Sequence, residues 1–157
     1  MPNTTVHIIR DVLLAYPKLN SAQPNQFGAK QFEVRIDFPV ARMAELSQFS
    51  RQTPRACDVA DDMLSINVRL PEFNAKGKAN SVPVLDMKGN ALSPTEVMEM
   101  GNGTKANVMV LRYQNPKDGK FSTQLRKIQV IEYKKYELDS IDFDIVGDTK
   151  AEFNDQF

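Results

Sequence analysis

Two segments of the chain alternate apolar and polar side chains so regularly that they restrict what the chain can fold into. Residues 32–38 place Phe, Val, Ile and Phe at every second position, with Glu, Arg and Asp between them. Residues 64–70 repeat the pattern with Leu, Ile, Val and Leu. Successive side chains of a strand point to opposite faces, so this period predicts strands with one buried and one exposed face. Pro39 and Pro71 are expected to end them.

The rest of the chain reads as more strands, long loops and little helix. We expect a first strand from Thr5 to Tyr16, ended by Pro17, and a last hairpin formed by residues 105–114 and 121–136 around the turn 115–120. Residues 82–86 predict a short edge strand, because Pro83 cannot donate to a central ladder. The segments 17–29 and 72–78 are expected to be loops.

Two short helices are expected. Residues 41–52 carry Met43, Leu46 and Phe49 at helical spacing, which predicts an amphipathic helix on the core. Residues 93–96 read Ser-Pro-Thr-Glu, a capping box with proline at the first helical position. About five strands without a βαβ rhythm predict an all-β fold, a five-stranded Greek-key barrel. In such a barrel the ligand lies across strands two and three, between the loops 17–29 and 115–120.

Charge divides the chain into two unequal parts. Residues 137–157 hold seven acidic residues and one lysine, a net charge of −6, so residues 1–136 carry +6 and the whole chain zero. This asymmetry predicts a domain over 1–136 with an anionic ligand and an acidic, flexible tail over 137–157. Phenylalanine is apolar and does not increase solubility, yet this tail ends on it, so solubility alone does not explain the tail. Its candidate partner-docking residues are Asp142, Asp144, Asp148, Glu152, Phe153, Asp155 and Phe157.

Several function classes are disfavoured by composition. One cysteine, Cys57, excludes an intramolecular disulfide, and one histidine, His7, excludes a Cys/His zinc cluster. The longest apolar run, residues 12–16, is far too short to span a membrane, and we expect no export leader. No glycine-rich phosphate loop occurs. We therefore expect a single cytoplasmic domain without a cofactor or metal.

One enzymatic alternative stays open. Asp58, Asp61 and Asp62 could hold Mg²⁺ in a small nuclease, although a solvated turn before the strand at Leu64 explains them better. His7 and Cys57 give no evidence of a base and nucleophile pair. We predict that the protein is not an enzyme.

Aromatic rings and cations occur together in the predicted loops and in the last hairpin. Single-stranded nucleic acid requires cations along the backbone path and ring faces for unstacked bases. Phe32, Phe38 and Phe49 are assigned to packing instead. The candidate DNA-binding residues are Tyr16, Phe27, Lys30, Arg35, Phe73, Lys76, Lys78, Lys105, Arg112, Tyr113, Lys117, Lys120, Phe121 and Arg126.

The later part of the chain resembles a known family. The run Gly-Asn-Gly-Thr-Lys-Ala-Asn-Val at 101–108, followed by Tyr113, Gly119, Leu125 and Gln-Val at 129–130, resembles the carboxy-terminal half of phage single-stranded-DNA-binding proteins. Pro-Glu-Phe at 71–73 with the following Gly/Lys loop and Val-Pro-Val at 82–84 is similar to the middle of that family. The acidic tail that ends in Phe is also typical of phage replication proteins.

This resemblance implies an OB-fold and binding of single-stranded DNA with little sequence preference, in phage DNA replication, recombination and repair. It further implies that the tail docks on partners such as the replicative polymerase and helicase, in the cytoplasm of the infected cell. From the charges we expect the tail to compete with DNA for the groove. A second copy of the chain is a further candidate partner. RNA is an alternative ligand, because OB-folds bind either strand type; an adaptor whose only functional part is the tail is a third reading.

Overall fold

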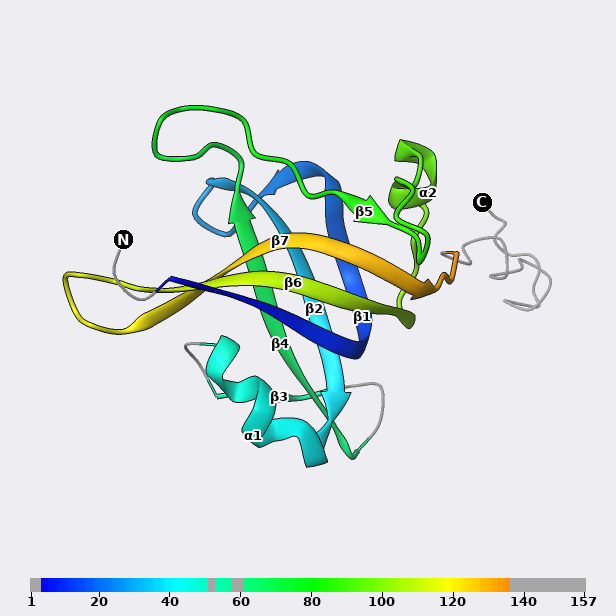
Figure 1. The fold of residues 1–157 in the computed structure, drawn as a ribbon, viewed down its shortest axis with the longest axis horizontal. Helices are drawn as coiled ribbons and strands as arrows, with labels where there is room; N and C mark the ends of the chain where they lie inside the picture. The colour runs from blue at the N-terminus through cyan, green and yellow to red at the C-terminus, as the bar shows by residue number, and fades with distance from the viewer. Residues whose placement is uncertain (1–3, 51–52, 58–60, 136–157) are drawn as a thin grey trace, which may run out of the picture.

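The structure is a computed structural model that describes residues 4–50, 53–57 and 61–135. Its strands form a sheet in the order β3-β4-β2-β1-β6-β7-β5, and an added β4–β7 pairing closes a five-stranded barrel. In Figure 1, β6 and β7 cross in front of β2 and β4. The strands are β1 (Thr5–Pro24), β2 (Lys30–Pro39), β3 (Arg55–Ala56), β4 (Met63–Pro71), β5 (Val84–Leu85), β6 (Thr104–Gln114) and β7 (Phe121–Glu132); the helices are η1 (Val40–Arg42), α1 (Met43–Leu46), η2 (Ser47–Phe49) and α2 (Pro94–Met98).

The barrel interior is built from the alternation seen in the sequence. The apolar residues of β2 and β4 face inward, and β2 pairs antiparallel with β4 from Gln31↔Pro71 to Pro39↔Met63 without a shift. Phe32 and Phe38 are buried, as predicted, and the inward residues of β1, β6 and β7 complete the core. The closing contact between β4 and β7 is a single parallel pair, Arg69↔Gln124. The predicted five-stranded barrel is confirmed.

Strand β1 corrects the first predicted boundary. It does not end at Pro17 but continues to Pro24, so most of the predicted loop 17–29 is strand. Pro17 is tolerated because the β1–β2 register shifts between Ala15 and Lys18, and a bulge is one of the few sheet positions that accept proline. Only the short turn from Asn25 to Ala29 remains of the loop.

The predicted helix over 41–52 is also corrected. The chain forms three consecutive short pieces, η1, α1 and η2, and Gln52 lies outside the described residues. Leu46 and Phe49 are buried as expected, but Met43 is exposed. None of the three pieces has a side-chain cap at its amino end, and the tight 3₁₀ turns on both sides interrupt the apolar stripe.

Other boundaries are confirmed or shortened. The capping box of α2 is present, with Ser93 and Glu96 bonding each other's backbone, and β5 is a short edge strand beside β7. Strand β7 ends at Glu132, earlier than the predicted limit at 136. The backbone N–H of Lys134 donates to the Thr104 hydroxyl instead of continuing the ladder.

No helix in the described parts of the chain is long and apolar enough to cross a membrane.

Candidate nucleic-acid interface

A groove crosses the outer face of β2 and β4. It consists of two hollows of about 330 and 530 Å³, which share Arg55, Ser65 and Asn67 in their walls. The first hollow reaches Ser122 and Thr123 on β7, and the second reaches Tyr16 and Lys18 on β1. The two hollows therefore form one continuous path from β7 across β4 and β2 to β1.

The groove is lined by more cations than carboxylates. Among the lining residues that the structure describes, Glu33 is the one acidic residue, and it forms an ion pair of 3.2 Å with Arg69. Asp37 lies beneath the surface with a side chain only 2% exposed. The described lining residues therefore carry a net positive charge, which suits an anionic chain. The lining cations are Lys18, Arg35, Arg55 and Arg69.

Arg35 is held rigidly in this groove. Its Nε and Nη2 donate to the two carboxylate oxygens of Asp37 at 2.8 and 3.1 Å, a bidentate pair. Its guanidinium lies 5.0 Å from the ring centroid of Tyr16, and its Nη2 is 3.6 Å from the Cys57 sulfur. The Tyr16 side of the groove therefore has a ring with a fixed cation against it.

A second ring and cation pair lies toward the other end of the groove. The Arg112 guanidinium is 3.8 Å from the centroid of the Phe121 ring, and its Nε donates to the Gln48 carbonyl at 3.4 Å. Phe121 and the groove residue Thr123 are two positions apart on β7, so they share a face. The two ring and cation pairs thus mark the two ends of the path.

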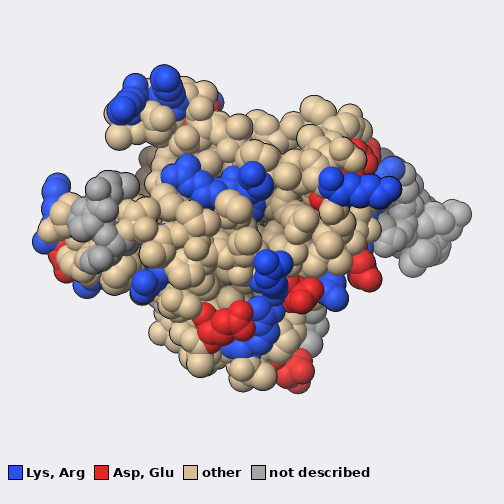
Figure 2. Space-filling model, in the orientation of Figure 1, with Lys and Arg blue, Asp and Glu red and all other residues tan. Residues whose placement is uncertain are grey.

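Another group of predicted residues gathers at the loops beside the barrel. The backbone carbonyl of Lys30 accepts the N–H of Glu72 at 3.2 Å, which brings the β1–β2 turn next to the loop after β4. Phe27 is 84% exposed and Phe73 54% exposed, so neither ring packs on the core. Lys and Arg side chains cover the part of this loop that projects from the barrel (Figure 2). Lys76 and Lys78 belong to this loop.

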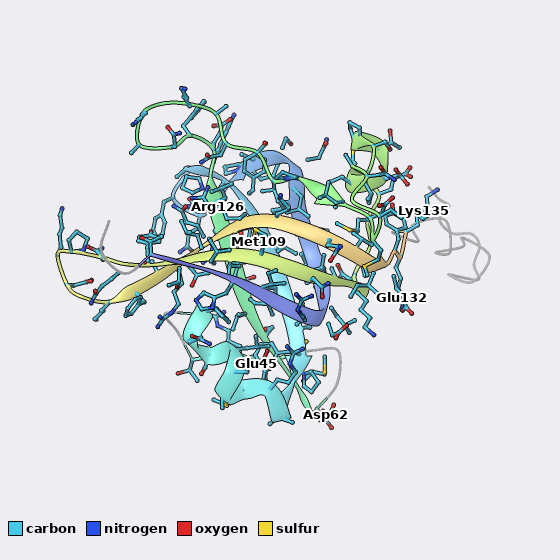
Figure 3. The ribbon with its side chains drawn as sticks, viewed as in Figure 1. Glu45, Asp62, Met109, Arg126, Glu132 and Lys135 are labelled. Atoms are coloured by element: carbon cyan, nitrogen blue, oxygen red, sulfur yellow. The ribbon has the colours of Figure 1, made fainter. Side chains whose placement is uncertain are left out.

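The remaining candidates lie elsewhere. Lys117 and Lys120 are exposed in the β6–β7 turn, and Tyr113 pairs with Ser122 in the same hairpin. Lys105 pairs with Leu13 and Glu132 at the opposite end of β6 from Arg112 and does not line the groove. Arg126 lies with Met109 on the β6–β7 face seen in Figure 3, and it does not line the groove either.

Sequence reasoning missed part of the groove. It named Arg35 but not Asn67 or Arg69, although both occupy the polar positions of the alternating segment 64–70. The polar face of that predicted third strand was the available signal, since the ligand was expected across strands two and three. Lys18 was assigned to a loop rather than to β1. No periodic signal marks Arg55, because β3 has only two residues.

Two of the three residues of the alternative nuclease site lie in one exposed turn. Asp61 and Asp62 are exposed in the turn before β4, and Asp62 lies at the tip beside α1 in Figure 3. Asp58 is outside the described residues, as is the whole predicted tail 137–157. In the ranges that the structure covers, no three His, Cys, Asp or Glu residues are close enough to hold a metal ion.

Comparison with solved structures identifies the fold. The single-stranded DNA-binding protein from bacteriophage Enc34 superposes with a TM-score of 0.56 at 14% identity, over 88% of each chain. The chain has the fold of phage single-stranded-DNA-binding proteins. Gp2.5, the single-stranded DNA-binding protein encoded by bacteriophage T7, is similar with a TM-score of 0.59 and 15% identity, over 96% of this chain and 100% of that one.

A third similar structure is the Enc34 protein in complex with single-stranded DNA, with a TM-score of 0.55 at 14% identity, over 83% of this chain and 88% of that one. No family model and no curated protein sequence matches the chain. The resemblance and the OB-fold expected from the sequence are therefore confirmed at the level of the fold.

Proposed function

We propose that this protein binds single-stranded DNA, with little sequence preference, in the groove across β1, β2, β4 and β7. The observation that carries the proposal is the groove itself: a positive path on the second and third barrel strands with an arginine-backed ring toward each end. Cations along the path bind phosphates and release counterions, while rings stack on bases of any identity. The similar phage proteins, one of them in complex with single-stranded DNA, support the same ligand.

The proposed role is to protect and organise single strands during phage DNA replication, recombination and repair, without enzymatic activity. Phe27, Phe73 and the lysines of the neighbouring loop extend the binding surface beyond the groove. The acidic tail 137–157 is proposed to dock the replicative polymerase and helicase and to compete with DNA. Phe153 and Phe157, near the end of the tail, supply the apolar contacts with these partners.

The test is binding of a labelled mixed-sequence single strand, followed by fluorescence anisotropy at several salt concentrations. If the four groove cations each neutralise one phosphate, the logarithm of the affinity falls with the logarithm of salt at a slope of about −2.8, from about −0.7 per phosphate. A matched duplex and a matched RNA are the controls. No binding at any salt would exclude the proposed function, and tighter binding of the RNA would make RNA the ligand.

Removal of the tail is expected to strengthen DNA binding. A segment of net charge −6 beside a body of +6 acts as a competing polyanion, and salt screens that competition. Residues 1–136 should therefore bind the single strand more tightly than the full chain at low salt, with the difference shrinking as salt rises. A variant with the tail acids replaced by Asn and Gln is the matched control for length. Equal affinities at low salt would contradict the competition.

A further inference from the structure

The backbone of Tyr16 is unusual for its position. Tyr16 has a φ of +50°, in the left-handed region that side chains other than glycine seldom adopt. It also precedes Pro17, and a residue before proline normally takes an extended conformation with negative φ. Such a conformation persists only where its surroundings impose it, and it points to a functional role for the residue so held.

Asn102 provides that constraint. Its Oδ1 accepts the backbone N–H of Tyr16 at 2.7 Å, across 86 positions of sequence. The adjacent Gly103 N–H donates to the Leu14 carbonyl at 2.8 Å, so the turn that contains Asn102 holds β1 on both sides of Ala15. This is also the point where β1 leaves β6, whose last pair with it is Leu14↔Thr104.

The turn that carries Asn102 is itself anchored to the barrel. Gly101 donates its N–H to the Lys134 carbonyl at 2.6 Å, and the fully buried Thr104 donates its hydroxyl to the Gly101 carbonyl at 2.9 Å. Gly103 adopts a φ of +90°, with the Lys134 side chain 3.4 Å from where a Cβ would lie. The backbone on both sides of Asn102 is therefore anchored, which places this exposed side chain where its Oδ1 reaches the Tyr16 N–H.

The result is an exposed ring with a fixed orientation. Tyr16 is 55% exposed, lines the groove, and has the Arg35 guanidinium 5.0 Å from its ring centroid. Arg35 is in turn fixed by the buried Asp37. Backbone and ring are thus both set before any ligand arrives, which lowers the ordering cost of stacking a base.

We infer that Asn102 is a positioning residue that aims the Tyr16 ring across the groove as a pre-formed platform for one base. The inference rests on the proposed function, since it names the residue that orders one contact of that site. It also gives a role to the Gly-Asn-Gly run at 101–103, which the sequence marks but the groove does not use directly.

The molecule contains an internal comparison. Asp11 has a φ of +54°, and its N–H donates to Oδ1 of another asparagine, Asn107, at 3.0 Å. Asp11 does not line the groove. Two asparagines thus each accept the N–H of a β1 residue with positive φ, and the loss of either can be compared. Only at Tyr16 does the held residue carry a ring that lines the groove.

The test is a double-mutant cycle on binding of a labelled oligothymidylate by the full chain. Tyr16→Ala is expected to weaken binding about tenfold, the lower part of the range for one stacked base. Asn102→Ala is expected to weaken it about fivefold when Tyr16 is present, and not measurably in the Tyr16→Ala background. Tyr16→Phe keeps the ring, so in that background Asn102→Ala should again weaken binding about fivefold.

Two controls separate positioning from stability. Asn107→Ala removes the equivalent bond at Asp11 and should lower the melting temperature while leaving oligothymidylate affinity unchanged. Asn102→Asp retains the acceptor oxygen, so once high salt screens its charge it should bind like the unmodified chain. Equal losses from Asn102→Ala in both Tyr16 backgrounds would overturn the inference, as would no loss in either. Failure of the unmodified chain to bind would instead overturn the proposed function.

Discussion

Replacing Arg35 by alanine is expected to destabilise the barrel and to weaken DNA binding at the same time. Asp37 has a side chain only 2% exposed, and the Arg35 guanidinium donates to both of its carboxylate oxygens. Removal of one partner from such a pair leaves a buried charge without compensation. We expect a loss of about 3 kcal/mol in the free energy of unfolding, the lower part of the range because Arg35 retains some exposure.

The two effects of Arg35 can be separated. Asp37→Asn in the Arg35→Ala background removes the carboxylate charge that has lost its partner. It should therefore recover much of the stability while DNA affinity stays low. Lys18→Ala is the matched control, because Lys18 lines the same groove and is exposed. It should change stability by less than about 0.5 kcal/mol and reduce the salt slope by about 0.7. Urea unfolding and anisotropy measure the two quantities. Unchanged stability of Arg35→Ala would contradict the assigned role of the pair.

Removal of the rings at the two ends of the groove is expected to have the largest effect on affinity. Tyr16 and Phe121 lie toward opposite ends of the path, each against an arginine. Each base–ring stack contributes about 1–3 kcal/mol; at about tenfold for each ring, the double variant Tyr16→Ala and Phe121→Ala should bind about 100-fold more weakly. Because no cation is removed, the slope of affinity against salt should be almost unchanged.

The control for ring removal is Tyr133→Ala. Tyr133 is exposed outside the groove, near α2, where its hydroxyl donates to the Glu96 carbonyl at 2.7 Å. The pKa of the Tyr133 hydroxyl is raised, first by partial burial against α2 and then by the negative charges of Glu99 and Glu96. Tyr133→Ala should leave affinity for the single strand unchanged. A loss from it as large as that of the ring pair would show that the aromatic effect is not specific to the groove.

The strands of the barrel could be predicted because their local patterns are strong. The alternation of 32–38 and 64–70 encodes both the strands and the face that each one buries, and the capping box encodes α2. The continuation of β1 past Pro17 could not be predicted in the same way. Proline is acceptable there only because a bulge falls at that point, and the bulge depends on the register with β2.

The groove was only partly predictable for a related reason. Arg35 and Tyr16 were named from their residue types, but their contact depends on the positive φ of Tyr16, which Asn102 stabilises from a distant part of the chain. The closure of the barrel likewise rests on one parallel pair between β4 and β7. Long-range pairing of this kind leaves no periodic trace in the sequence.

The most direct test of the account is an NMR titration of the isotopically labelled chain with a short oligothymidylate, recording amide and arginine side-chain shifts. The central claim is that DNA lies across β2 and β4. DNA bound there should cause the largest shifts at Arg35, Arg55, Asn67 and Arg69, with small shifts at Lys105 and Arg126 outside the groove. Shifts concentrated around Arg126 on the β6–β7 face, with the β2–β4 face unchanged, would contradict it.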